Sequence, residues 1–337
     1  MRARFGRLTS TGIVYGVLLA SILIGTVLTA MEGRNFFATG NLAAILTFTS
    51  TLGLIAIGQT LVILVGSLDL SVPYVVSLCS VAAGGVMADQ TGMIVPGVLV
   101  ALAIAAGIGM VNGLVVSLLG VHGFIATLGM GLIVSGYMTA NYKGTSGSAP
   151  EPFRTLDTAN IGPVPLSAII MLACALLAIL LLRRTRVGHH IYAVGGGREV
   201  ARLSGIRTAV PVVVAHTLCS LLAGLAGLLL LARLSVGNPT IGSQGGYDLM
   251  SIAAVVLGGT LLAGGKGNIL GTLGGVAIFA VMDQVMSVIQ VTSFLQDVFR
   301  GLVIVLAVAV YARREIERRP ARFERPNALD AALQEAR

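Results

Sequence analysis

Groups that could support catalysis are sparse in this chain, and their spacing fits no common active site. A phosphate-binding loop requires a glycine, four intervening residues and then Gly-Lys-Ser/Thr. The nearest candidate is Gly265-Lys266, but Thr260 stands at the first glycine position and Gly267 follows the lysine. No Ser/His/Asp arrangement is evident either. We therefore expect no enzyme activity and no ATP-binding site in this chain.

Cysteine and histidine side chains are too dispersed to indicate a metal site. The three cysteines lie in apolar segments at wide spacing, and the four histidines lack the spacing of zinc ligands. The sequence therefore predicts no metal, no disulfide framework and no cofactor. The residues concerned are Cys79, Cys174, Cys219, His122, His189, His190 and His216.

Few ionisable side chains fall within the apolar segments. A proton- or sodium-coupled carrier buries several such groups along its route. The deficit favours an energy supply from another subunit, with a self-sufficient secondary transporter or channel as the alternative. The residues are Asp69, Asp248, Asp283, Asp297 and Arg300.

The composition indicates that transmembrane helices must position these polar and ionisable residues. The chain has 337 residues, of which 55% are hydrophobic and only 11% are charged, whereas soluble domains carry about 25% charged residues. Apolar runs of roughly 20 residues recur, and each can cross a ~30 Å hydrocarbon core as a helix. The sequence predicts an all-α polytopic membrane protein, and it excludes a soluble enzyme.

Ten transmembrane spans give the best division of the sequence. We expect a transmembrane domain over 1–315 and a cytoplasmic tail over 316–337. The first span is longer than the apolar core of a signal peptide, so it is expected to be retained. The spans are 12–31, 42–66, 71–88, 94–119, 123–141, 164–182, 209–232, 248–263, 268–289 and 295–312.

The net charge of +8 comes from three basic clusters beside apolar segments, which argues against nucleic-acid binding. Positive clusters mark cytoplasmic loops. Ten crossings place all three clusters on the cytoplasmic side and the polar loop 141–163 outside. Both termini are therefore expected in the cytoplasm. The clusters are Arg2 to Arg7, Arg183 to Arg207 and Arg313 to Arg325.

Two polar, glycine-containing interruptions predict broken helices. Gly66–Ser71 places a carboxylate and two hydroxyls between apolar runs, and Gly258–Gly267 interrupts the eighth and ninth spans. Non-helical backbone at membrane depth survives only when protein buries it or when it lines a cavity. Paired interruptions also suggest an internal inverted repeat, although no sequence repeat aligns.

The basic loop 183–208 is the most informative segment. We expect a flexible turn at Gly195–Gly197 and a short helix over Glu199–Leu203 that is closed by Gly205. Such a helix could insert into a groove on a partner protein. The alternative is a loop anchored by its arginines to anionic lipid headgroups.

Five blocks of sequence resemble the ribose-type permeases of bacterial ABC sugar importers over nearly the whole chain. They are Ser67–Val72, Asn112-Gly113, Phe124–Leu128, Ala201–Ile206 and the stretch Ile252–Thr260 with its continuation to Thr272. The resemblance implies a bacterial inner-membrane subunit that moves a sugar or sugar-like solute, a pentose, hexose or polyol, by alternating access. It also implies partner ATPases that bind the ATP, a periplasmic solute-binding protein, and a second permease that is identical or different. The scarcity of charge in the spans suits a small neutral solute.

The resemblance assigns roles to two groups of residues. The coupling group would dock on the ATPase: Gly195, Glu199, Ala201, Arg202, Leu203, Ser204, Gly205 and Ile206. The second group would form a translocation path or hinge: Gln59, Asp69, Ser71, Asn112, Asp248, Gly258, Gly259, Thr260, Gly264 and Gly265. For Asp69 we favour a capping role at the start of the third span over solute contact. For the glycines we favour close packing over solute contact.

Overall fold

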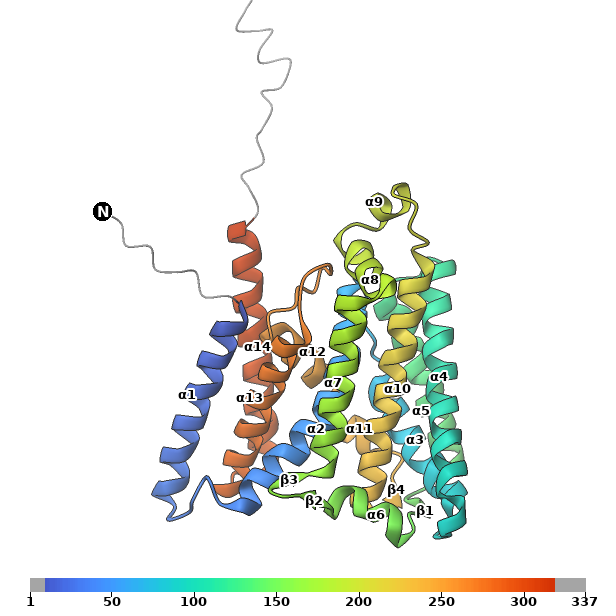
Figure 1. Cartoon of the computed structure of the whole chain (residues 1–337). Coiled ribbons are helices and arrows are strands. Elements are labelled where there is room, and N and C mark those ends of the chain that lie inside the picture. Colours follow the sequence, from blue (N-terminus) through green and yellow to red (C-terminus); the bar gives the residue numbers. More distant parts are fainter. Residues whose placement is uncertain (1–9, 319–337) are drawn as a thin grey trace, which may run out of the picture.

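The computed structural model describes residues 10–318 and is almost entirely helical (Figure 1). It confirms the all-α class. Within the described residues, seven helices are long and apolar enough to cross a membrane. They are α1 (Ser10–Met31), α2 (Thr39–Leu64), α4 (Ile94–Leu118), α5 (Gly123–Asn141), α7 (Leu166–Arg184), α10 (Ala209–Leu234) and α13 (Ile269–Val288).

Three further helices occupy the remaining predicted spans. They are α3 (Val72–Met87), α12 (Tyr247–Leu257) and α14 (Ser293–Arg318). Each of the ten predicted spans therefore contains a helix, and α3 and α12 are the two shorter apolar ones. The arginines at 2, 4 and 7 and most of the tail predicted at 316–337 lie outside the described residues.

The predicted eighth span, 248–263, is wrong in its second half. Helix α12 ends at Leu257, because Gly259 adopts a left-handed backbone conformation (φ 88°). The N–H of Gly259 then bonds to the carbonyl oxygen of Val256 at 2.9 Å. The 11 residues of α12 cover only about 16 Å, roughly half of a hydrocarbon core.

The bundle has two distinct ends. One end, which we call the α9 end, carries α8 (Arg186–Gly196) and α9 (Arg198–Leu203) (Figure 1). The opposite end, the β1 end, carries the short strands and α6 (Glu151–Thr158). Strand β1 (Ser146–Ser148) pairs antiparallel with β4 (Val236–Gly237), and β2 (Asn160–Ile161) pairs antiparallel with β3 (Val164–Pro165). Two single-turn elements complete the part of the chain that the structure describes, η1 (Thr91–Met93) and α11 (Ile241–Gln244).

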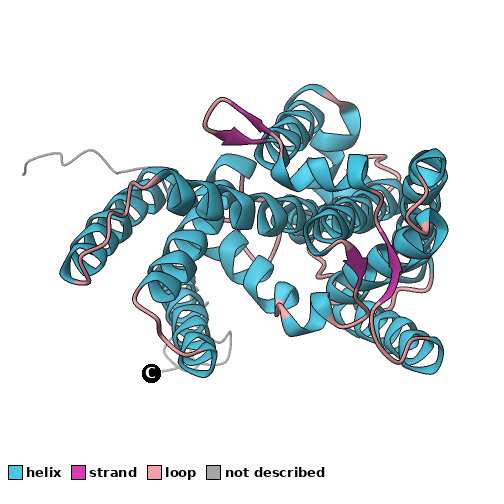
Figure 2. Cartoon of the chain, turned by 90° about the horizontal axis from the view of Figure 1, so that it is seen from below, coloured by secondary structure: helices cyan, strands magenta, loops and turns pink. Residues whose placement is uncertain are grey.

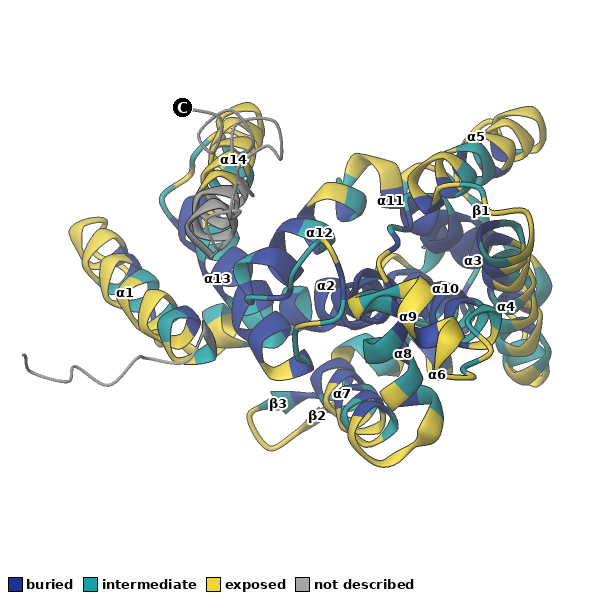
Figure 3. Ribbon diagram, turned by 90° about the horizontal axis from the view of Figure 1, so that it is seen from above, coloured by how far each residue is buried: buried dark blue, intermediate teal, exposed yellow. Residues whose placement is uncertain are grey.

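Helices α2 and α10 form the centre of the bundle. Every residue of α2 from Thr49 to Leu64 is buried, whereas α1, α4 and α5 show exposed faces toward the periphery (Figure 3). Seen from the β1 end, the described chain is helical apart from the two small strand pairs and the connecting loops (Figure 2). Glycines let α4 and α10 approach closely: a Cβ atom at Gly113 would lie 2.5 Å from the Cα of Val213. Backbone contact of this kind is how transmembrane helices gain packing energy where lipid offers no hydrophobic driving force.

Candidate functional site: a junction of three glycine segments

The basic loop is more helical than the sequence predicted. The hydroxyl of Thr185 accepts a hydrogen bond from the N–H of Gly188 at 3.1 Å, which caps the start of α8. The turn predicted at Gly195–Gly197 is confined to Gly197, since Gly195 and Gly196 form the last residues of α8. The helix extends this far because its apolar residues Ile191 and Val194 are buried against the bundle.

Three glycine segments, far apart in the sequence, meet at the α9 end. The N–H of Gly265 bonds to the carbonyl oxygen of Leu64 at 3.0 Å. A Cβ atom at Gly195 would lie 1.8 Å from that same oxygen and 2.6 Å from the Gly265 nitrogen. A Cβ atom at Gly264 would lie 2.9 Å from the nitrogen of Gly66. The end of α8 is thus locked between the two interruptions, in what we call the glycine junction (residues 64–66, 195–196 and 264–265).

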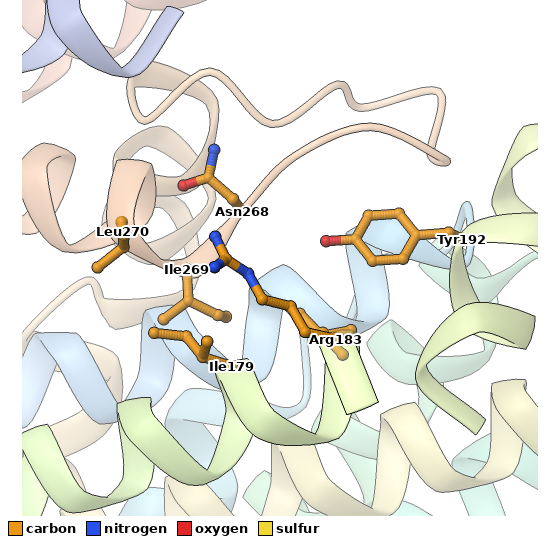
Figure 4. A pocket seen from close by; sticks show the side chains of 7 residues that line it. Ile179, Arg183, Tyr192, Asn268, Ile269 and Leu270 are labelled. Atoms are coloured by element: carbon orange, nitrogen blue, oxygen red, sulfur yellow. The ribbon is translucent and has the colours of Figure 1, made fainter. Parts of the chain in front are cut away.

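A second link between α8 and the loop before α13 lies beside the junction. The hydroxyl of Tyr192 donates to the carbonyl oxygen of Gly267 at 2.9 Å. Burial raises the pKa of this phenol, opposed by the nearby positive charge of Arg183. The hydroxyl therefore remains a donor at neutral pH. Figure 4 shows Tyr192 and Arg183 on the wall of a small pocket, with Arg183 directed toward Asn268.

Helix α9 presents two apolar side chains outward from the α9 end, among charged ones. Leu203 is 79% exposed and Val200 is 69% exposed. Arg202 pairs with Glu199 at 2.7 Å, and both side chains face solvent. Gly205 closes the helix at φ 82°, and the N–H of Ile206 bonds to the carbonyl oxygen of buried Ala201 at 3.0 Å. The short helix and its glycine stop are confirmed, and its exposed leucine suits a protein partner.

Asp69 organises the break between α2 and α3. Its Oδ1 accepts from the backbone N–H of Ser71 at 3.0 Å and from the hydroxyl of Ser71 at 2.5 Å. The amide of Asn112 in turn donates to that hydroxyl at 2.9 Å. Asp69 therefore closes the turn that leads into α3, and it lies two residues before the N-cap position, which Ser71 occupies.

Asp69 also contacts a histidine that the sequence did not connect with it. His216 Nδ1 lies 3.3 Å from Asp69 Oδ2, and His216 Nε2 lies 3.0 Å from the hydroxyl oxygen of Ser67. The expectation that no Ser/His/Asp arrangement exists is therefore wrong. His216 stands on α10, and nothing in the local sequence marks it as the partner. Since Asp69 and His216 are completely buried, the arrangement ties the break to α10 and offers no accessible nucleophile.

Helix α5 holds the other side of the break. The hydroxyl of Thr127 accepts from the N–H of Leu70 at 2.9 Å. A Cβ atom at Gly123 would lie only 1.9 Å from the hydroxyl oxygen of Ser67. The broken backbone is thus enclosed by α4, α5 and α10, which is the condition for irregular chain at membrane depth.

The predicted path residues fall into separate groups. Asp69, Ser71 and Asn112 share the network described above. Gly258, Gly259, Thr260, Gly264 and Gly265 form the second interruption, where a Cβ atom at Gly258 would lie 2.5 Å from the carbonyl carbon of Gly271. Gln59 lies in the core beside Cys219, with Sγ 3.7 Å from Oε1, and Asp248 is half-buried at the start of α12. This geometry supports the packing interpretation of Gly258.

Comparison of the sequence with known proteins shows the family to which the chain belongs. The profile described as "Branched-chain amino acid transport system / permease component" matches residues 41–308. The chain belongs to this family of ABC importer permeases. The ribose import permease RbsC of Escherichia coli K12 is 40% identical over 308 residues, covering 88% of this chain and 93% of that protein. RbsC of Bacillus subtilis is 35% identical (85% and 89% covered), and the galactose/methyl galactoside import permease MglC of Haemophilus influenzae is 32% identical (90% and 95% covered).

These relatives define the permease as a multi-pass inner-membrane transport subunit, not an enzyme. No solved structure matches the chain. The glycine junction and the Asp69 network are therefore known from the present structure of this permease and not from a solved relative.

Proposed function

We propose that the permease carries a pentose, hexose or related polyol, with ribose as the first solute to test. The names of the relatives describe them as import permeases for ribose or for galactose and methyl galactoside. Within the spans, Asp69 pairs with His216 and Arg300 pairs with Asp283. Each of these side chains has a protein partner, which leaves hydroxyl and amide groups to bind solute. An amino acid, whose ammonium and carboxylate must both be neutralised at membrane depth, is the less suitable cargo.

Energy coupling is the second part of the proposal. We place α9 in a groove of a cytoplasmic ATPase, because its exposed Leu203 and Val200 gain by burial against protein. The observation that supports a role of α8 and α9 in energy coupling is the contact of Gly195 with Leu64 and Gly265. A shift of α8 moves both interruptions together, since no side chain lies between the three backbones. Each nucleotide state of the ATPase would favour one packing of the bundle.

The complete importer would contain two permease copies, identical or different, two ATPases that bind ATP, and a binding protein at the β1 end. The α9 end would face the cytoplasm and the β1 end the periplasm. This orientation rests on the arginines of the 183–208 loop. The permease itself would bind no nucleotide.

Reconstitution into proteoliposomes tests the function. We expect labelled ribose to accumulate only when ATPase, binding protein and ATP are all present, and labelled leucine not to accumulate. The purified permease alone should hydrolyse no ATP. Accumulation without the ATPase would favour the alternative, a secondary transporter or channel, and hydrolysis by the permease alone would contradict the proposal.

A further inference from the structure

The connection between α10 and α12 enters the bundle as the short strand β4, a loop and the single helical turn α11. It starts at the β1 end, where β4 pairs with β1, and then follows α3 inward. The N–H of Asn238 bonds to the hydroxyl of Ser80 at 3.4 Å, and the N–H of Gly242 bonds to the hydroxyl of Ser77 at 3.0 Å. A Cβ atom at Gly242 would lie 1.8 Å from the carbonyl oxygen of Pro73. The segment 236–246 is therefore pressed onto α3, and we call it the re-entrant segment.

The position along α3 gives the depth of this segment. Helix α3 starts at the buried break and reaches the β1 end, where the N–H of Asp89 bonds to the carbonyl oxygen of Ser148. Ser77 lies about 8 Å along the helix axis from Val72 and about 15 Å from Met87. Figure 1 accordingly draws α11, the single turn of the re-entrant segment, between the two ends of the bundle. Because the long apolar helices span the distance between these two ends, we expect the segment to reach the level of the membrane interior.

Polar side chains are exposed at this depth. Thr240, Ser243 and Gln244 are all exposed, and among the described residues no side-chain hydrogen-bond partner is found for the Gln244 amide. The exposed side chains in the middle of the peripheral helices are apolar, such as Leu132 at 62% and Leu177 at 65%. Lipid accepts those leucines, but it cannot satisfy an amide or irregular backbone. The exposed face of the re-entrant segment therefore requires a polar, water-accessible environment.

We infer that Ser243 and Gln244 on the re-entrant segment contact the transported solute. The inference rests on the proposed function. Thr240 fixes the turn, since its N–H and hydroxyl both donate to Asn238 Oδ1, at 2.9 and 3.1 Å. The hydroxyl of Ser243 donates to the carbonyl oxygen of Thr240 at 3.0 Å, which leaves its lone pairs for a solute hydroxyl. Gln244 offers two donors and one acceptor, the complement of a neutral polyhydroxyl solute.

Thiol labelling tests the environment without requiring transport. Ser243→Cys and Leu132→Cys are made in a Cys174→Ser background, because Cys174 is the half-buried native thiol and the other two are buried. The assembled importer is treated with a charged maleimide, both without nucleotide and with its ATPases trapped by vanadate. We expect Ser243→Cys to react at least tenfold faster than Leu132→Cys in one of the two states, and sugar to slow that reaction. Equal rates in both states would overturn the inference.

Transport by Gln244 variants tests the contact itself. Gln244→Leu keeps the volume and removes the amide, and we expect uptake to fall about five- to tenfold, the effect of losing one net hydrogen bond. Gln244→Asn should retain more activity than Gln244→Leu. Gln90→Leu is the matched control, since Gln90 is exposed beyond the end of α3. If the unaltered importer moves no sugar, the proposed function fails while labelling still decides the environment. If it moves sugar and Gln244→Leu is unimpaired, the inference alone fails.

Discussion

The backbone N–H of Gly265 donates a 3.0 Å hydrogen bond to the carbonyl oxygen of Leu64, which joins the loop after α12 to the last residue of α2. Gly195 lies against both atoms. The C-terminus of a helix leaves carbonyl oxygens without intrahelical partners. For the Leu64 oxygen at the end of α2, the donor comes from Gly265 in the Gly258–Gly267 interruption. The end of α8 therefore packs against a bond that ties the two broken regions together.

Gly195→Ala should disrupt this junction. Its Cβ would lie 1.8 Å from the Leu64 oxygen. Backbone atoms cannot move aside by a side-chain rotation, so we expect the free energy of unfolding to fall by about 1–3 kcal/mol. Sugar transported per ATP hydrolysed, measured in proteoliposomes, should fall at least tenfold. Gly196→Ala is the control, because its Cβ would meet nothing within 4 Å. Equal behaviour of the two variants would refute the role of the junction.

Leu203→Glu should weaken ATPase binding without disturbing the permease. Leu203 is 79% exposed, so its replacement costs the isolated fold little. Arg202→Glu should act similarly, since the exposed pair with Glu199 contributes at most about 1 kcal/mol to the fold. Co-purification of the ATPase with each variant measures the effect, and we expect a loss of tenfold or more.

Gly205→Val and Arg186→Glu separate docking from headgroup anchoring. Gly205 has φ 82°, where a β-branched residue costs about 1–2 kcal/mol, so this variant should also lose the ATPase. Arg186 lies outside α9, and its substitution should have a milder effect. Equal losses for Arg186→Glu and Arg202→Glu, with none for Gly205→Val, would support the anchor.

His216→Ala should destabilise the permease strongly. It leaves the buried carboxylate of Asp69 with one hydrogen-bond partner fewer, a change that costs about 1–3 kcal/mol, and more for a charged group. The midpoint of thermal unfolding in detergent should therefore fall. His122→Ala is the matched control, because His122 is exposed at the start of α5. An unchanged midpoint for His216→Ala would show that the pair does not hold the break.

Cysteine labelling of intact cells should establish the orientation. Thr145 is exposed at the β1 end and Ser204 is exposed at the α9 end. An impermeant maleimide should label Thr145→Cys from outside and should reach Ser204→Cys only after the cells are opened. The reverse pattern would show that the permease is inserted the other way round.

The sequence by itself was sufficient for the all-α class and for the approximate positions of the ten helices, because each span must hide its backbone within its own hydrogen bonds. It also indicated the two interruptions and the glycine that closes α9, since those depend on local residue types. It could not show that Gly195, Leu64 and Gly265 meet, or that His216 joins Asp69 and Ser67 across 147 and 149 residues. The re-entrant course of 236–246 was missed for the same reason: its hydrogen-bond partners Ser77 and Ser80 lie on α3. Local pattern determined which segments become helices, and only tertiary packing decided which polar groups satisfy one another, because a buried donor requires an acceptor but the sequence does not say which one.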